Sequence, residues 1–170
     1  MIELLQLPPA TRFILQGGPA ARTAAGEAFG LPLPESACRA NARDGRAALW
    51  LGPDEHLLLA PTDERDILAD GLESALAGFA HSLVEVSQRQ IAVQVSGPHA
   101  STILNTGCPL DLDPAEFPPG MCTRTLLGKA EIVIWRTGAE AFHLEVWRSF
   151  ADYVLAWLRE ADRLNLRGDS

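Results

Sequence analysis

The sequence has few cysteines, no long apolar run and no excess of basic residues. Its cysteines, Cys38, Cys108 and Cys122, form no Cys-x-x-Cys pair and no Cys/His spacing typical of a metal site. An odd count fits reduced thiols, and the first residues lack the basic segment and long apolar run of a signal peptide. No apolar stretch approaches the roughly 20 residues of a membrane helix. We therefore expect a soluble, cytoplasmic protein that does not contact a membrane.

Basic residues are also in deficit. The chain carries 22 Asp and Glu against 14 Lys and Arg, a formal net charge of -8. Nucleic-acid binding requires clustered Lys and Arg that face the phosphates, and here the basic residues are scattered. We expect no nucleic-acid partner, and an acidic surface that mainly keeps the protein in solution.

The length and composition favour one folded domain. Hydrophobic residues make up 47% and charged residues 21% of 170 residues, which is ordinary for a globular protein. We expect a single domain over residues 1–170, which could consist of two lobes, 1–80 and 81–170. A chain of this length buries roughly two thirds of its unfolded surface, so its stability requires no metal.

The first third is rich in proline and glycine, which predicts only short regular elements there. Residues 11–16 form the one predicted strand, and residues 38–46 are predicted to be a polar connection with its sharpest turn at Asp44-Gly45. Residues 47–51 and 56–60 then predict a β-hairpin with a four-residue loop.

A helix should follow this hairpin. Thr62 is its predicted N-cap, and Gly78 marks its predicted end. Its apolar positions recur close to every 3.6 residues, which predicts one buried face. That face consists of Ile67, Leu68, Leu72, Leu76 and Phe79.

The second half shows a clearer pattern. Strands are predicted at 82–87 and 90–95, a short helix at 99–105 after Pro98, and a last helix capped by Ser149 with Asp152 in its first turn. Between these helices lie three predicted antiparallel strands, 121–127, 130–136 and 142–147. Antiparallel runs punctuated by helices predict an α+β fold, with helices packed on one face of antiparallel sheets.

Motifs for catalysis or metal binding are missing. The histidines, which we expect to be surface or packing residues, are His56, His81, His99 and His143. They do not have the spacing of paired metal ligands on a helix. Gly128-Lys129 lacks the rest of a phosphate loop, and Ser96 and Ser149 lack the Gly-x-Ser-x-Gly context of a nucleophile. We expect Cys108, beside Pro and Leu, to be a small buried hydrophobe.

One carboxylate and three aromatic residues are the remaining candidates for function. Glu131 opens a predicted strand and could be a general base, although an exposed cross-strand partner for Arg124 or Arg148 is the more common role. Large aromatics with arginines are typical of interface anchors, as well as of cores. The candidate interface residues are therefore Trp135, Trp147, Trp157, Arg124 and Arg148.

Several stretches resemble a known family. Residues 83–87 (Leu-Val-Glu-Val-Ser) and 90–98 (Gln-Ile-Ala-Val-Gln-Val-Ser-Gly-Pro) resemble the aminomethyltransferase (glycine-cleavage T-protein) folate-binding superfamily. The closer resemblance is to the gamma subunit of heterotetrameric sarcosine oxidase, at Gly-Cys-Pro-Leu-Asp-Leu (107–112), at 122–135 and at Glu-Val-Trp-Arg-Ser-Phe-Ala-Asp-Tyr-Val (145–154). The resemblance implies a fold like the N-terminal part of an aminomethyltransferase.

The resemblance also implies a function. The family's complex has four different subunits and demethylates sarcosine oxidatively, within folate-linked one-carbon metabolism of bacteria. The alpha subunit is expected to hold NAD, tetrahydrofolate and FAD, with FMN shared between alpha and beta, the oxidation site in beta, and zinc in delta. The gamma subunit is expected to bind no cofactor and to dock on alpha. The resemblance thus implies a non-catalytic, structural subunit.

The sequence departs from the aminomethyltransferases in one strand. In that group an acidic pair opens the strand that corresponds to 130–135, whereas this chain has Ala130 and Glu131. It also has about half the length of an aminomethyltransferase. The alternative that stays open is a stand-alone folate-binding or aminomethyltransferase-like protein with Glu131 as its acidic residue.

Overall fold

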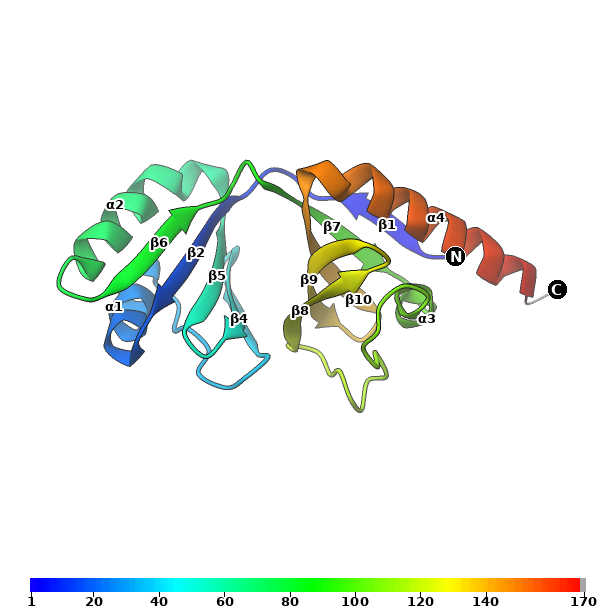
Figure 1. Cartoon of the computed structure of the whole chain (residues 1–170), viewed down its shortest axis with the longest axis horizontal. Helices are drawn as coiled ribbons and strands as arrows, with labels where there is room; N and C mark the ends of the chain where they lie inside the picture. The colour runs from blue at the N-terminus through cyan, green and yellow to red at the C-terminus, as the bar shows by residue number, and fades with distance from the viewer. Residues whose placement is uncertain (169–170) are drawn as a thin grey trace. The chain divides into compact units, whose positions relative to one another are not determined.

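The computed structural model describes residues 1–168, with side chains through residue 165 (Figure 1). The chain forms two compact units. Unit 1 combines Met1–Pro8 with the chain from Gln88 onward, and unit 2 is Pro9–Ser87. The described residues contain no helix that is both long and apolar enough to cross a membrane.

Unit 2 is an antiparallel five-stranded sheet with two helices. Its strands, in the order β3-β4-β5-β2-β6, are β3 (Ala40–Arg43), β4 (Arg46–Gly52), β5 (Glu55–Ala60), β2 (Thr11–Gly17) and β6 (His81–Glu85). Its two helices are α1 (Pro19–Phe29) and α2 (Arg65–Leu76), and each of them has one buried side. Phe13, Leu58 and Leu72 lie in the core that the helices and the sheet share.

Helix α1 is missing from the sequence-based prediction, which was wrong to exclude a long element from the first third. Pro19 stands at the start of α1, where a missing N–H is harmless and the fixed φ suits a helix. Gly30 ends the helix in the left-handed region at φ 72°. Ala21 and Phe29 are buried. Proline and glycine thus mark the helix ends instead of interrupting its interior.

The predicted turn and hairpin of unit 2 are confirmed, but the strands and the loop have different boundaries from those predicted. Asp44 and Gly45 both have positive φ, 54° and 79°, as a two-residue hairpin turn requires. This turn joins β3 to β4, so β3 lies in the segment predicted to be a connection. The loop between β4 and β5 has two residues instead of four.

The start and the buried face of α2 differ from the prediction. Thr62 lies in a 3-10 turn, η1 (Thr62–Glu64), and the N-cap of α2 is Glu64, so the prediction of Thr62 as the N-cap is wrong. The buried face is Leu68, Leu72 and Leu76. Ile67 is 72% exposed, and Phe79 lies beyond the end of the helix.

Unit 1 is a second antiparallel five-stranded sheet. Its strands, in the order β1-β7-β10-β9-β8, are β1 (Glu3–Gln6), β7 (Gln90–Ser96), β10 (Ala141–Trp147), β9 (Ala130–Gly138) and β8 (Cys122–Leu127). Its helices are α3 (Ala100–Asn105) and α4 (Ala151–Gly168). The predicted strands β7 to β10 and the helix α3 are confirmed. The α+β class with antiparallel sheets is confirmed as well.

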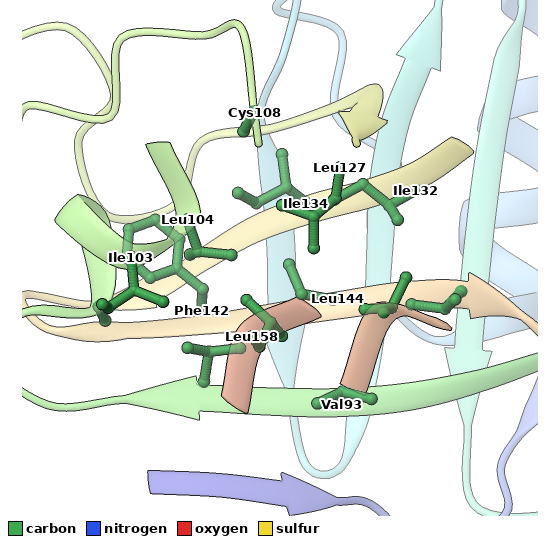
Figure 2. Close-up of a cluster of buried hydrophobic side chains, with 14 of the residues drawn as sticks. Val93, Ile103, Leu104, Cys108, Leu127, Ile132, Ile134, Phe142, Leu144 and Leu158 are labelled. Atoms are coloured by element: carbon green, nitrogen blue, oxygen red, sulfur yellow. The ribbon is translucent and has the colours of Figure 1, made fainter. Parts of the chain in front are cut away.

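The core of unit 1 lies between its helices and one face of its sheet. Figure 2 shows Val93, Ile134 and Leu144 from three strands, together with Leu104 of α3 and Leu158 of α4. Each of these five side chains is fully buried. At roughly 1.5–3 kcal/mol for each fully buried aliphatic side chain, this cluster is a main source of the unit's stability.

The chain enters α4 differently from the prediction. Ser149 lies within a 3-10 turn, η2 (Arg148–Phe150), between β10 and the helix, so it does not stand at the predicted cap. Asp152 is in the first turn of α4, as predicted, where the helix dipole favours a carboxylate. Cys108 is buried in the core, which confirms its prediction as a small hydrophobe.

Candidate functional site

A polar pair lies on the face of the unit 1 sheet that points away from α3 and α4. His143 Nε2 donates to Glu145 Oε1 at 2.7 Å, and the Glu145 side chain has no exposed surface. Trp135 is in register with His143 on the neighbouring strand, and their rings lie 5.6 Å apart at 50°. Helical spacings do not predict this pair, because its two positions share a face only in a strand, where residues two apart lie on the same side.

Further along the same face, the sheet ends in a mixed apolar and charged surface, which we call the Trp147 end. Leu126 of β8 is in register with Glu131 of β9. Val146 of β10 is in register with Ile132 of β9, so the next residue, Trp147, lies beside Glu131. The Arg89 guanidinium lies over the Trp147 ring, 5.0 Å from its centroid. Arg148 directly follows Trp147. The Trp147 end consists of five residues, Arg89, Leu126, Glu131, Trp147 and Arg148.

Trp157 lies elsewhere. It is on α4, on the side of the sheet that the helices cover, and it packs against Gly107 and Gly128. Its Nε1 donates to Thr106 Oγ1 at 3.2 Å, and its ring is 6.0 Å from that of Tyr153. Of the predicted interface residues, the structure thus brings Trp147 and Arg148 together, and it separates Trp157 from them.

The other two predicted interface residues share the sheet face of Trp147. Trp135 is half-buried, and Arg124, which is in register with Val133, is exposed. Glu131 is exposed too, and it is in register with Leu126, so Arg124 does not lie directly opposite it.

A buried arginine holds the long loop of unit 1. Arg136 is 2% exposed, and its Nη1 donates to the carbonyl oxygens of Leu112 at 3.0 Å and Phe117 at 2.9 Å. Further bonds reach the carbonyls of Gly138, the last residue of β9, and Ala139, and the guanidinium lies 4.9 Å from the centroid of the Phe142 ring. Because the bonds of Arg136 go to backbone carbonyls, its side chain anchors the loop 106–121.

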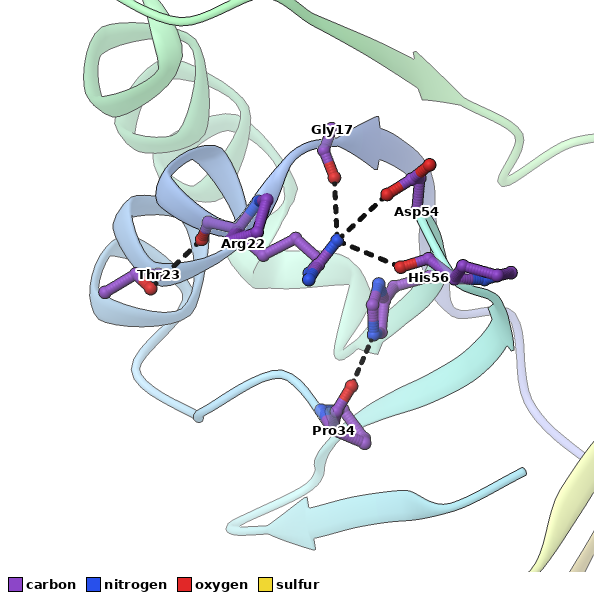
Figure 3. A network of polar contacts seen from close by, with 8 residues as sticks. Gly17, Arg22, Thr23, Pro34, Asp54 and His56 are labelled. Carbon is purple, nitrogen blue, oxygen red and sulfur yellow. Dashed lines mark hydrogen bonds and ion pairs between the residues drawn. The ribbon is translucent and has the colours of Figure 1, made fainter. Parts of the chain in front are cut away.

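Unit 2 has a comparable network (Figure 3). Arg22 Nη1 donates to the Gly17 carbonyl and to Asp54 Oδ1, both at 3.2 Å. His56, which is fully buried, donates from Nε2 to the Pro34 carbonyl at 2.7 Å. Burial disfavours the charged imidazole and lowers the pKa of His56. His56 is therefore a packing residue, as predicted.

Each unit has a cavity among its described residues. One of about 480 Å³ in unit 2 is lined by charged side chains of both signs, among them Arg22, Glu27 and Arg43. The other, of about 440 Å³ in unit 1, runs along α4 beside Trp157 and Leu164. Among the residues that the structure describes, no three His, Cys, Asp or Glu side chains are grouped as metal ligands.

The fold is shared with proteins of known structure. Over 92% of the chain it is similar to the glycine cleavage system aminomethyltransferase T from Bartonella henselae, with a TM-score of 0.70, 15% identity and 45% of that protein covered. It is also similar to the regulatory subunit of aspartate kinase from Thermus thermophilus, with a TM-score of 0.59, 12% identity and coverage of 94% and 97%. At these identities the likeness concerns the fold alone.

The sequence then defines the family. Residues 16–163 match the model of the sarcosine oxidase, gamma subunit family. Sarcosine oxidase subunit gamma of Arthrobacter sp. is 34% identical over 145 residues, 85% of this chain and 70% of that protein. That of Corynebacterium sp. strain P-1 is 35% identical over 136 residues, 79% and 66% of the two chains. The chain belongs to the sarcosine oxidase gamma subunit family, as the sequence resemblance predicts.

A solved structure agrees with this family. A chain of the heterotetrameric sarcosine oxidase from Corynebacterium sp. U-96, in complex with pyrrole 2-carboxylate, matches with a TM-score of 0.88 and 31% identity. The match covers 94% of this chain and 83% of that chain. This chain thus spans about two thirds of the Arthrobacter and P-1 relatives and more of the solved chain.

Proposed function

We propose that this chain is the structural gamma subunit of a heterotetrameric, flavin-dependent sarcosine oxidase. The observation that carries the proposal is the match to a chain of the Corynebacterium sp. U-96 enzyme, with a TM-score of 0.88 over 94% of this chain. In the proposed complex, sarcosine is demethylated oxidatively in folate-linked one-carbon metabolism, and this chain docks on the alpha subunit without catalysing a step.

The interactions of the buried polar side chains support a structural role. Arg136 donates to the loop carbonyls of Leu112 and Phe117, and His56 donates to the Pro34 carbonyl. Catalytic groups need a polar atom directed at a substrate, whereas these atoms are directed at the backbone of the chain itself. Such bonds stabilise loops and give the chain a defined surface for a partner.

The cofactors of the proposed enzyme belong to the neighbouring subunits. We propose that FAD, FMN, NAD and tetrahydrofolate are held by alpha and beta, and zinc by delta. The three free cysteines, two of them buried, are consistent with an assembly in the reducing cytoplasm.

Co-expression tests this function. The chain is produced with the alpha, beta and delta subunits, and a parallel culture omits it. We expect the full set to purify as a complex of four polypeptides that produces hydrogen peroxide from sarcosine. The culture without this chain should give an unstable or incomplete complex. A complete, fully active enzyme that lacks this polypeptide would refute the proposal.

Titration of the isolated chain with tetrahydrofolate tests the alternative activity. A structural subunit should show no saturable change in tryptophan fluorescence or heat of binding. Saturable binding that disappears in Glu131→Gln would instead favour a folate-binding protein with Glu131 as its acidic residue. Glu145→Gln serves as the comparison, because Glu145 is a carboxylate of the same sheet that already has a histidine partner.

A further inference from the structure

The Trp147 end gathers exposed apolar side chains at one end of the unit 1 sheet. Leu126 is 48% exposed and Trp147 is 40% exposed. Phe150, in the turn that follows β10 and outside the five residues of the Trp147 end, is 40% exposed as well. Leu127 and Ala130 are fully buried in the core, so the alternation of the strands directs Leu126 and Glu131 outward. Large apolar side chains exposed together in this way are typical of interaction sites.

The charge at this end is opposite in sign to that of the chain. The protein has a formal net charge of -8, yet exposed cationic side chains outnumber carboxylates here. Within the Trp147 end, the cations of Arg89 and Arg148 accompany the carboxylate of Glu131. Directly beside it, Lys129 of the turn between β8 and β9 and Asp152 of α4 are exposed. A local excess of positive charge on an acidic protein selects for a partner surface with carboxylates, because complementary potentials favour encounter and orientation.

The Trp147 ring is held in place before any partner binds. Arg89 covers one face of it at 5.0 Å. The backbone N–H of Arg148 donates to the Arg89 carbonyl at 2.8 Å, and Arg148 Nε donates to the Gln88 carbonyl at 3.1 Å. These bonds join the end of β10 to the start of β7. An ordered aromatic side chain loses little conformational entropy on binding, so it makes an effective anchor.

We propose that the Trp147 end is the surface through which this chain binds another subunit, whose contact face has an apolar pocket for the Trp147 indole and carboxylates around that pocket. This inference rests on the proposed function and specifies the surface and the chemistry of the partner. Aromatic and arginine side chains dominate binding energy at protein interfaces. A second copy of this chain fits less well, since a two-fold contact would bring the same cations together.

The first experiment truncates the anchor. The full-length chain, as wild type or Trp147→Ala, is titrated into the complex of the other three subunits, and the dissociation constant is measured by biolayer interferometry. We expect Trp147→Ala to weaken binding about 30-fold or more, the range of interface anchors. Phe79→Ala is the matched control, because Phe79 is also 40% exposed but lies in unit 2. It should bind like the wild type.

The second experiment reverses the charge. The double variant Arg89→Glu with Lys129→Glu should slow association about tenfold at low salt and weaken its dependence on ionic strength. Arg159→Glu, on the exposed side of α4, is the control and should change neither quantity. Circular dichroism melts confirm that each variant is folded. If Trp147→Ala fails to fold, the double variant decides the question.

The outcomes separate this inference from the proposed function. A Trp147→Ala chain that is folded and binds with wild-type affinity refutes the docking surface, while the subunit role stands. A wild-type chain that binds none of the other subunits refutes the subunit role itself. If Trp147→Ala abolishes self-association of the isolated chain and leaves binding to the other subunits unchanged, the surface joins two copies and the inference is wrong.

Discussion

The role of Arg136 as the anchor of the loop 106–121 leads to a quantitative prediction. Arg136→Met keeps the length and apolar stem of the side chain and removes its donors. The carbonyls of Leu112 and Phe117, which accept buried hydrogen bonds from Arg136, then have no donor from this side chain. Each buried carbonyl left unsatisfied destabilises by about 1–3 kcal/mol.

The two carbonyls together give a loss of about 2–6 kcal/mol. The contact of the guanidinium with Phe142, 4.9 Å from the ring centroid, adds about 1 kcal/mol or more when desolvated. The variant also removes the penalty of burying a charge, which offsets part of this loss. We therefore expect Arg136→Met to lower the free energy of unfolding by about 3 kcal/mol, a large part of the usual 5–15 kcal/mol.

Urea unfolding, followed by tryptophan fluorescence and far-UV circular dichroism, measures this loss. Arg136→Lys should lose less than Arg136→Met, because one ammonium group can bond one or two carbonyls but cannot reproduce the fork of the guanidinium. Arg159→Met is the control on the exposed side of α4 and should stay within about 0.5 kcal/mol of the wild type. A loss below about 1 kcal/mol in Arg136→Met, with unchanged amide exchange of the loop, would refute the anchoring role.

Three further predictions concern protonation and backbone conformation. Burial lowers the pKa of His56, so below about pH 6.5 the unfolded chain binds more protons than the folded chain. The free energy of unfolding should therefore decrease as the pH is lowered through this range. His56→Gln should flatten this slope in urea unfolding between about pH 8 and about pH 5.5, and equal slopes would contradict the assignment. The hydrogen bonds from Arg65 lower the pKa of Glu85, so stability from this pair is present above the ordinary Glu pKa and lost as the pH falls. Arg65→Ala should raise that pKa in a carboxyl NMR titration, and an unchanged value would count against the pairing. Gly128→Ala should lower the melting temperature more than Gly120→Ala, since both have positive φ but only at Gly128 would a Cβ meet a tyrosine hydroxyl; equal losses would show that strain alone matters.

The second half of the fold was predictable because its signals are local. In β9 and β10, alternating apolar residues such as Ile132, Ile134 and Leu144 indicate strands that bury one face. Glycine at position 128, with φ 58°, marks the hairpin between β8 and β9. Each of these signals depends on neighbours within a few residues, so single-sequence reasoning can find them.

The missed elements depend on position within an element or on distant partners. Pro19 and Gly30 look like interruptions until they are placed at the two ends of α1. Strand β1 is stabilised by pairing with β7, where Leu4 is in register with Val95, about half the chain away. No local pattern in four residues can reveal such a pairing, and the same holds for the membership of residues 1–8 in unit 1.

The candidate surface was predictable in its residue types and not in its grouping. Tryptophans and arginines were expected at an interface, but only the register of β8, β9 and β10 shows which of them share a face. It joins Trp147 to Glu131 and Leu126, and it leaves Trp157 on the other side of the sheet. The pair of His143 and Glu145 could have been found from the sequence by searching for polar residues two apart in a strand.

The strand that opens with Ala130 and Glu131 connects the fold to the proposed function. A fold does not determine an activity, and this one is similar to an aminomethyltransferase at 15% identity. Where the sequence resemblance leads us to expect an acidic pair, Ala130 is fully buried in the apolar core. A carboxylate at that position would have to be buried without a partner, which is strongly unfavourable. The remaining carboxylate, Glu131, is exposed between Leu126 and Trp147. In this chain, the position that corresponds by resemblance to the acidic pair of the aminomethyltransferases therefore belongs to the proposed docking surface.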